Sequence, residues 1–330
     1  MYASTAPGPA LRRIHNDEDD EVDEEDRLIN RLKLLALTCW ALAPALLLLQ
    51  PAAAQIAQPT LEKIRSANVI AIGYRETSVP FSYVVGDKDV IGFSQDICSK
   101  VIDAVRAKTN RPYLQVRFIP VTSQNRIPLV QNGTVDLECG VTTNLKARQA
   151  QVAFSYTFFV AATRLLTRKD SGIHDFADLA GKTVLTNQGT TSERILRSMN
   201  LEKQMNMRII SARDYAEGRA TLESGRAVAY MMDDVLLAGT RSLTAKPAEW
   251  TIVGTPQSSE AYALMMRNGD PEFRQLVDDT LAALMKSGEI DAIYKKWLES
   301  PVRPKGANFQ FPMSAQLRAL YAAPNDRAFD

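Results

Sequence analysis

From Thr60 onward, short apolar runs alternate with stretches of helical periodicity, and this alternation constrains the fold more than any other feature of the chain. Residues 69–74 are predicted to form a strand, residues 96–105 a helix, and residues 114–120 another strand that ends at its proline. Alternating strands and helices are typical of parallel α/β sheets. With 330 residues, 45% of them hydrophobic, the chain can bury one large core or two ordinary ones.

A second series of strands and helices is predicted to begin near Arg164. Apolar runs predict strands at residues 181–185, 207–211, 228–232 and 261–266, and helical spacing predicts long helices over residues 271–287 and 290–299. Thr190 and Glu193 have the spacing of a capping box, which predicts the start of a further helix. The sequence shows no internal repeat, and no low-complexity linker follows Pro59.

The first 54 residues are predicted to be an N-terminal extension followed by a signal peptide. An acidic segment spans residues 17–26, Arg31 and Lys33 follow it, and an apolar run fills residues 34–49 before small residues up to Ala54. A basic pair, a short apolar core and small residues are typical of a secretory signal, so we expect cleavage after Ala54. The alternative is an uncleaved anchor, although the run is shorter than the roughly 20 residues of a spanning helix.

The chain that remains after cleavage is expected to be mildly basic. The whole sequence has 39 Lys and Arg against 38 Asp and Glu, and residues 1–54 hold five of the basic and nine of the acidic residues. The remainder therefore carries a net charge of about +5, which suits an anionic ligand. No basic run with interleaved aromatic residues indicates a nucleic-acid partner.

Two cysteines, Cys98 and Cys139, remain in this predicted mature chain. In an oxidising compartment they could form a disulfide. Because both stand among apolar residues, we interpret them as small buried side chains, and the disulfide stays open. His15 and His174 are the only histidines, and no Cys or His spacing predicts a metal site or a cofactor.

Residues 139–148 have the composition of a carboxylate-binding turn. A predicted helix from about Arg126 leads into a predicted buried strand over residues 135–138 that ends in Gly140 and two threonines, and a helix start with Arg148 follows. Glycine allows a ligand to approach the backbone, and threonine hydroxyls and helix-start amides donate hydrogen bonds. An arginine can add two parallel hydrogen bonds to the same anion. The alternative is a surface turn with a solvated arginine.

Longer stretches of the sequence carry a resemblance to a known family. They are residues 73–83, 119–129, 221–234 and the tail 299–330. From about Leu61 to the C-terminus, the chain resembles the periplasmic solute-binding proteins of polar amino-acid ABC transporters, which form bacterial extracellular solute-binding protein family 3. Within this family it is most similar to the glutamate/aspartate-binding type.

The resemblance implies the α/β fold of type II periplasmic binding proteins, in which two hinge strands join two lobes and the ligand binds in the cleft between them. The hinge strands are expected near residues 158–162 and 257–261. Lobe one would consist of residues 61–159 and 260–330, and lobe two of residues 160–259. The implied function is to bind glutamate or aspartate in the periplasm and to deliver it to an inner-membrane ABC permease and its ATPase. A monomer is expected.

For the α-carboxylate of the ligand, the resemblance implies a clamp that both lobes build. Thr143 and Arg148 match the family's positions on lobe one, and Thr190 and Thr191 supply a helix N-terminus on lobe two. Two lobes that bind one carboxylate would couple ligand binding to closure of the cleft.

For the ammonium group of the ligand, the resemblance implies an acidic partner. Asp233 matches that position, and the backbone carbonyl of Val141 is a second expected acceptor. The alternative role of Asp233 is to cap a helix over residues 234–241.

An acidic ligand side chain needs an excess of donors, and we expect Arg75, Ser123 and Arg126 to supply them. Arg75 follows a predicted strand at its carboxyl end, where the crevices of α/β sheets open. Ser123 and Arg126 follow the next strand, three residues apart, so that one helix start can present both. A buried arginine is costly without an anion, which favours acidic ligands over neutral ones. The alternative for either arginine alone is a surface or interlobe salt bridge.

Two residues depart from the pattern of the glutamate/aspartate-binding type. Val141 stands where that type has a serine that can reach the ligand, so one hydroxyl contact is lost. Tyr215 stands where a histidine of lobe two contacts the side-chain carboxylate, and a phenol donates one hydrogen bond but cannot become cationic. Packing on the interlobe surface is the alternative role of Tyr215. The preference among glutamate, aspartate and their amides therefore stays open.

Two other functions remain as alternatives to a binding protein that leaves its ligand unchanged. A secreted cyclohexadienyl-dehydratase-like enzyme on the same fold would need a cleft carboxyl group as an acid, and Glu76 and Glu138 are the candidates. A membrane-tethered amino-acid sensor would keep residues 34–49 as its anchor.

Overall fold

The computed structural model describes Ile29 and residues 58–328. The apolar run at residues 34–49 and the expected cleavage site after Ala54 lie outside the described residues. The described residues from Gln58 onward form a compact unit. Within the described part of the chain, no helix is long and apolar enough to cross a membrane.

The first part of this unit, here called lobe one, is built on parallel strands. Strand β1 pairs in parallel with β5 and with β6. Helix α3 buries Ile97, Val101 and Val105, which follow one another at intervals of four residues and so form one apolar face. The elements in order are α2 (Thr60–Ala67), β1 (Val69–Tyr74), α3 (Phe93–Thr109), β5 (Gln115–Pro120), α4 (Arg126–Gln131), β6 (Leu137–Thr143), α5 (Lys146–Gln149) and β7 (Ala153–Phe154).

A small antiparallel sheet is inserted between β1 and α3. It contains β2 (Thr77–Ser78), β3 (Ser82–Val85) and β4 (Asp89–Ile91) in the order β2-β3-β4. Sequence periodicity did not predict it, because strands of two to four residues are too short to show an alternating pattern.

The second part, called lobe two, repeats the α/β arrangement around β9, β10 and β11. Strand β9 pairs in parallel with both β10 and β11. The elements in order are β8 (Phe159–Arg168), η2 (Phe176–Leu179), β9 (Thr183–Asn187), α6 (Thr191–Glu202), β10 (Arg208–Ala212), α7 (Tyr215–Glu223), β11 (Ala229–Asp233), α8 (Asp234–Leu243), η3 (Pro247–Glu249) and β12 (Trp250–Val253).

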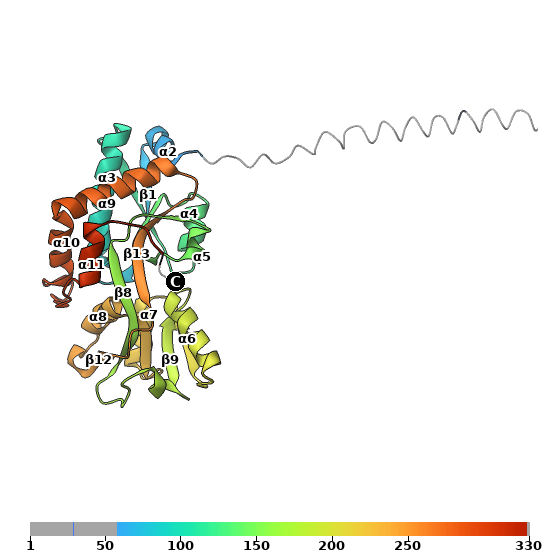
Figure 1. Cartoon of the computed structure of the whole chain (residues 1–330), viewed down its shortest axis with the longest axis vertical. Helices are drawn as coiled ribbons and strands as arrows, with labels where there is room; N and C mark the ends of the chain where they lie inside the picture. The colour runs from blue at the N-terminus through green and yellow to red at the C-terminus, as the bar shows by residue number, and fades with distance from the viewer. Residues whose placement is uncertain (1–28, 30–57, 329–330) are drawn as a thin grey trace, which may run out of the picture. The chain divides into compact units, whose positions relative to one another are not determined.

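The chain then returns to lobe one and ends in helices. Strand β13 (Ser259–Met266) is followed by α9 (Pro271–Ser287), α10 (Glu289–Leu298) and α11 (Ala315–Ala322). In Figure 1, α9 and α10 lie beside α3 and α11 lies beside α9, whereas α6, α7 and α8 belong to the other lobe. The predicted helices at 271–287 and 290–299 thus correspond to α9 and α10.

Strands β8 and β13 connect the two lobes. They run side by side in Figure 1 and pair in antiparallel fashion, with Ala162 opposite Ser259 and Phe159 opposite Tyr262. The strand order is β10-β9-β11-β8-β13-β6-β1-β5. These residues overlap the expected hinge segments, and the exact lobe boundaries stay a prediction.

The alternation of strands and helices suggested parallel sheets, but the large sheet is mixed. Strand β8 is antiparallel to β11, and β13 is antiparallel to β6. The reason is that a chain which leaves lobe one and returns to it must cross between the lobes twice, in opposite directions. Apolar periodicity detects a strand but carries no information about its direction.

Aromatic side chains fix the connecting strands against lobe one. Phe159 of β8 and Tyr262 of β13 are fully buried, and their ring centroids lie 5.8 Å apart. The ring of Phe81 lies edge-on to both, at 4.9 Å and 5.4 Å. Edge-to-face aromatic contacts of this kind stabilise a core beyond the area that they bury.

A disulfide joins Cys98 of α3 to Cys139 of β6. Both residues are buried, as expected, but the interpretation as separate small side chains was wrong. The carbonyl oxygen of Cys139 also accepts hydrogen bonds from Ser94 Oγ at 3.0 Å and Gln95 Nε2 at 2.6 Å. Helix α3 therefore holds β6 at the position that directly precedes Gly140.

Candidate ligand-binding site

The predicted site residues lie at strand ends and helix starts that face the opposite lobe. Arg75 follows β1, Ser123 follows β5, and Thr143 ends β6. Because these strands are parallel, their carboxyl ends lie at one edge of the sheet. Lobe two contributes the start of α6 after β9, and Asp233 at the end of β11.

Arg75, Ser123 and Tyr215 come together from the two lobes. Arg75 is 2% exposed, and its Nη1 donates a hydrogen bond to Ser123 Oγ at 3.1 Å. Its guanidinium carbon lies 5.9 Å from the centre of the Tyr215 ring, a cation–π arrangement. The ring of Tyr215 is buried, and burial raises the pKa of its phenol. The packing role considered for Tyr215 is thus present, although Arg75 is the group on which it packs.

Arg126 is buried in lobe one beside β6. Its Nη1 donates to Thr142 Oγ1 at 2.6 Å and to the Val141 carbonyl oxygen at 3.1 Å. One acceptor position of that carbonyl, which we expected to bind the ligand ammonium, therefore faces an arginine. Burial, and next the positive charge of Arg148, lower the pKa of Arg126 to about 9, while Glu138 opposes this shift. Arg126 Nε is buried and has no acceptor among the described residues.

Glu138 stands behind this arginine in the core. It is fully buried, and its Oε2 accepts a hydrogen bond from Thr142 Oγ1 at 2.7 Å. Thr142 in turn receives the hydrogen bond from Arg126, so Glu138 orients Arg126 through one threonine. A Cβ at Gly140 would lie 2.1 Å from Glu138 Oε1, so only glycine leaves room for this carboxylate.

Thr143 and Arg148 lie close together, as the expected clamp requires. Arg148 Nη1 donates to the Thr143 carbonyl oxygen at 2.9 Å. Burial lowers the pKa of Arg148, and the nearby carboxylates of Glu260 and Asp233 oppose that shift. The hydroxyl of Thr143 does not point to an open position: it donates to Glu260 Oε2 at 2.6 Å.

Thr190 and Thr191 begin α6 on lobe two. Thr190 Oγ1 accepts a hydrogen bond from the Glu193 amide at 3.1 Å and donates to the Asn187 carbonyl at 2.6 Å. The predicted helix cap is thus present, although Glu193 Oε2 accepts from the amide of Gly189 and not from that of Thr190. Thr191 Oγ1 donates to Glu260 Oε2 at 2.9 Å.

Asp233 occupies the N-cap position of α8, but its side chain makes no capping hydrogen bond. It accepts a hydrogen bond from Tyr262 Oη, and longer ones of 3.4 Å from Thr163 Oγ1 and Ser192 Oγ. The helix-cap alternative is therefore wrong. Burial, followed by the negative charge of Glu260, raises the pKa of Asp233 to about 8.

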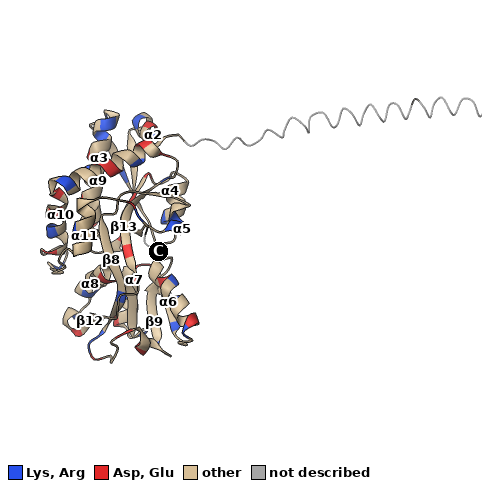
Figure 2. Cartoon of the chain, in the orientation of Figure 1, with Lys and Arg blue, Asp and Glu red and all other residues tan. Residues whose placement is uncertain are grey.

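Glu260 was not predicted from the sequence as a site residue, although it is the one acidic residue of β13, which shows one red segment in Figure 2. The residue is 2% exposed and lies where β13 leaves lobe two. Besides the hydroxyls of Thr143 and Thr191, it accepts a hydrogen bond from Ser258 Oγ at 2.5 Å. A charged residue at the start of an otherwise apolar strand was the signal that could have identified it.

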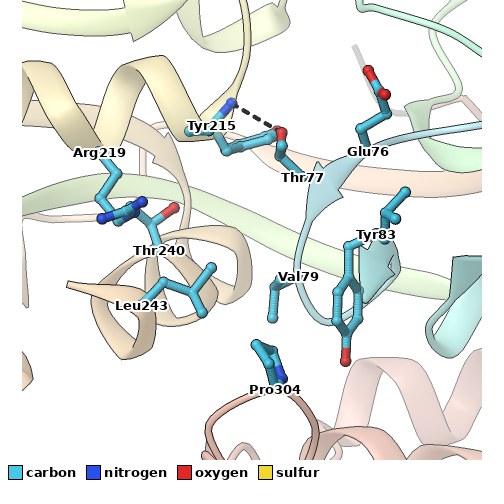
Figure 3. A pocket seen from close by; sticks show the side chains of 11 residues that line it. Glu76, Thr77, Val79, Tyr83, Tyr215, Arg219, Thr240, Leu243 and Pro304 are labelled. Carbon is cyan, nitrogen blue, oxygen red and sulfur yellow. Dashed lines mark hydrogen bonds between the residues drawn. The ribbon is translucent and has the colours of Figure 1, made fainter. Parts of the chain in front are cut away.

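A cavity of about 160 Å³ lies beside Tyr215 (Figure 3). Residues of both lobes line it, including Thr77, whose Oγ1 accepts a hydrogen bond from the Tyr215 amide at 3.3 Å. Of the ten expected ligand-binding residues, Tyr215 is the one that lines it. Glu76 is exposed at this cavity, whereas Glu138 belongs to β6 and is fully buried, so the two carboxyl groups considered for an enzyme do not share a site.

No group of His, Cys, Asp and Glu side chains among the described residues could hold a metal ion. The polar groups gathered between the lobes are instead arginines, hydroxyls and carboxylates, which suit an organic ion with both charges.

Known proteins are similar to the part of the chain that builds the two lobes. The family described as bacterial extracellular solute-binding proteins, family 3, matches residues 70–300, which is more than half of the sequence. The chain belongs to this family. The resemblance drawn from the sequence is thereby confirmed.

Two relatives resemble this family 3 solute-binding protein over most of their length. The glutamate/aspartate import solute-binding protein of Salmonella typhimurium is 54% identical over 84% of this chain and 92% of its own. The L-glutamate/L-aspartate-binding protein of Pseudomonas aeruginosa is 50% identical over 86% of this chain and 94% of its own.

A solved structure supports the fold of this family 3 solute-binding protein. The ancestral amino acid-binding protein AncCDT-1, described as a precursor of cyclohexadienyl dehydratase, matches it with a TM-score of 0.62 and 27% identity. The match covers 72% of this chain and 99% of the ancestral protein. The expected two-lobed periplasmic binding protein fold is confirmed.

Proposed function

We propose that this family 3 solute-binding protein binds glutamate or aspartate in the periplasm and delivers it to an inner-membrane ABC permease with its ATPase. Relatives that are 50% and 54% identical over most of the chain carry names for glutamate and aspartate. One structural observation supports an acidic ligand above all: the buried guanidinium of Arg75, oriented by Ser123 and Tyr215 from opposite lobes. Such a group needs an anion, because a neutral ligand would leave its donors unpaired.

The charges between the lobes fit an amino acid with two carboxylates. Three arginines and two carboxyl groups lie there: Arg75, Arg126, Arg148, Asp233 and Glu260. A third carboxyl group, that of Glu138, lies behind Arg126 in the core. The raised pKa of Asp233 keeps its carboxyl group largely neutral at pH 7, which leaves the site with an excess of positive charge. A ligand ammonium beside Asp233 would ionise that group, and two ligand carboxylates would face the arginines.

We assign the ligand contacts accordingly. Arg148 and the amides at the start of α6, at Thr190 and Thr191, would bind the α-carboxylate. Asp233, with the Val141 carbonyl, would accept from the ammonium group. Arg75, Ser123 and Arg126, with the Tyr215 hydroxyl, would bind the side-chain carboxylate.

Secretion through a cleaved signal peptide belongs to the same proposal. Family 3 consists of extracellular solute-binding proteins, and the expected signal precedes the compact unit that begins at Gln58. N-terminal sequencing of the periplasmic protein should give Gln55 as the first residue. Recovery of the chain in the membrane fraction would instead support the tethered sensor.

The enzyme alternative receives little support. The relatives are solute-binding proteins, and the two candidate carboxyl groups, Glu76 and Glu138, lie in different surroundings. Incubation with the bound amino acid should return it unchanged.

Calorimetric titration of the chain from Gln55 onward tests the ligand. Glutamate and aspartate should bind, and glutamine and asparagine should bind at least tenfold more weakly, because their amides leave an arginine unpaired. Arg75→Lys should weaken binding of the acids tenfold or more, since lysine lacks the planar fork. Arg168→Lys, at an exposed arginine paired with Asp170 and Glu249, is the matched control and should bind normally. Equal binding of acids and amides would contradict the proposal.

A further inference from the structure

We infer that Glu260 is an interlobe positioning residue: its carboxylate accepts hydrogen bonds from the Thr143 hydroxyl of lobe one and the Thr191 hydroxyl of lobe two. Both hydroxyls thereby direct their protons at Glu260 and can only accept hydrogen bonds from a ligand. No charge of the ligand needs to be present for this contact, because the carboxylate belongs to the chain itself. The role of the two hydroxyls toward the ligand rests on the proposed function, whereas the contact between the lobes does not.

The position of Glu260 supports this role. It lies near the start of β13, one of the two strands that connect the lobes, opposite Ala161 of β8. Its side chain is 2% exposed. A carboxylate at such a site requires compensation by hydrogen bonds, and both of its oxygens receive them.

The hydrogen bonds show which groups Glu260 joins. Oε2 accepts from Thr143 Oγ1 at 2.6 Å and from Thr191 Oγ1 at 2.9 Å. Thr143 ends β6 in lobe one, and Thr191 begins α6 in lobe two. A single oxygen atom therefore contacts both walls of the cleft, and separation of the lobes must break at least one of these bonds.

The second oxygen of Glu260 fixes its orientation. Oε1 accepts from Ser258 Oγ at 2.5 Å and lies 3.5 Å from Thr163 Oγ1. Ser258 and Thr163 belong to the segments that connect the lobes, and their hydroxyls lie 2.6 Å apart. Oε2 is thus held toward the cleft by groups that do not depend on a ligand.

The direction of these hydrogen bonds determines what the threonines can offer. A hydroxyl has one proton, and the protons of Thr143 and Thr191 are directed at Glu260. The free positions on both oxygens are lone pairs, which accept from an ammonium group and do not bind a carboxylate. The α-carboxylate contacts are consequently left to Arg148 and the backbone amides, and the threonine side chains act with Asp233.

The lobes also contact each other through Tyr215 and Thr77. Glu260 differs from that contact because it lies on the connecting strand and contacts both sides at once. Its loss should therefore change the separation of the lobes even when no ligand is added.

Distance measurement between the lobes is the direct test. Tyr113 in lobe one and Leu201 in lobe two are 89% and 80% exposed, so Tyr113→Cys and Leu201→Cys provide sites for a pair of spin labels. The native cysteines of the compact unit are joined to each other and do not react with the labels. Distances are recorded with and without glutamate, in the chain from Gln55 onward.

Two substitutions of the same residue separate its roles. Glu260→Leu removes the acceptor and should lengthen the mean interlobe distance without glutamate and weaken glutamate binding about tenfold. In Glu260→Gln, the amide oxygen can still accept from both threonines, so the interlobe distance should stay close to that of the parent chain. Thermal melting checks that both variants are folded.

A double-mutant cycle tests the partners. Thr191→Val should lengthen the distance in the parent chain but have no further effect in Glu260→Leu, because the two changes remove the same bond. An unchanged distance in folded Glu260→Leu without glutamate would overturn the inference, whatever the ligand proves to be. Weaker binding with an unchanged distance would make Glu260 a ligand contact only and would likewise overturn it. Failure of the parent chain to bind glutamate, with a lengthened distance in the variant, would reject the proposed ligand and retain the interlobe role.

Discussion

Asp233 is a buried carboxyl group whose ionisation depends on its surroundings. Burial raises its pKa to about 8, Glu260 adds to the shift, and the hydrogen bond from Tyr262 reduces it. The other titratable groups that face it are Asp234 of α8, Tyr215 of α7 and Arg148 of α5. Below pH 8 the group is therefore mostly protonated, and it carries no charge until a cation approaches it.

Binding of glutamate is expected to release a proton at neutral pH. The ligand ammonium would stabilise the ionised form of Asp233 and lower its pKa in the complex. The dissociation constant should then rise as the pH falls from 8 toward 6, by at most tenfold per pH unit. Calorimetry at pH 7 in two buffers with different heats of ionisation measures the number of protons released.

Asp233→Asn is the control for this prediction. It should bind glutamate more weakly and release no proton. The pKa of Asp233 in the folded chain lies above its ordinary value of 3.8, so folding favours the protonated form and the wild type loses stability as the pH rises from about 4 to about 8. The variant should therefore melt at a higher temperature than the wild type at pH 8, but not at pH 4. Undiminished proton release in the variant would show that another group titrates.

At the scale of elements, the disulfide between α3 and β6 holds the strand that carries Val141 and Thr143. Its cysteines are 41 residues apart in the sequence. The same strand end is also held by Ser94 and Gln95, which bind the Cys139 carbonyl. The covalent bond and the two hydrogen bonds thus act on one point, directly before the turn at Gly140.

Removal of the disulfide by Cys98→Ala with Cys139→Ala should lower the free energy of unfolding by about 4 kcal/mol, the loop-entropy value for a loop of this length. Denaturant titration measures this loss. Glutamate affinity should fall much less, because Ser94 and Gln95 still position β6. A reducing agent should destabilise the wild type but leave the double variant unchanged. Equal stability of the wild type and the variant would refute the prediction.

Most elements could be predicted from the sequence because each has its own periodicity. The expected strand 69–74 is β1, and the expected helix 271–287 is α9, with the same bounds. Strands β2, β3 and β4 were too short to show an alternating pattern of apolar residues. Strand directions and the disulfide were not predictable, since both depend on where the chain returns in space.

For the whole molecule, the site depends on contacts between residues that are far apart in the sequence. The resemblance selected Arg75, Ser123 and Tyr215, and the structure places these three in contact across the lobes. The sequence did not show that Thr143 and Thr191 donate to one carboxylate, because Glu260 is 117 and 69 residues away from them. Local patterns indicate candidate residues, while their hydrogen-bond partners follow from the arrangement of the two lobes.

The approach of the two lobes also depends on one glycine. Gly189 has a φ of +73°, and a Cβ built there would lie 3.0 Å from Gln124 Cγ and 3.2 Å from the backbone of Ser123. Lobe two therefore contacts lobe one at the residue that receives the hydrogen bond from Arg75. Gly181 has a similar φ of +70° in the same lobe but has no neighbour within 4 Å of such a Cβ.

The comparison of Gly189→Ala with Gly181→Ala separates backbone strain from interlobe contact. Both variants should lose roughly 1–2 kcal/mol of stability, because alanine is strained at positive φ. Only Gly189→Ala should also weaken glutamate binding, by about tenfold, since its methyl group meets the backbone of Ser123, which cannot move aside as a side-chain end can. Calorimetric titration and thermal melting of both variants measure the two effects. Equal glutamate affinity in the two variants would mean that the lobes do not meet at Gly189 when the ligand is bound.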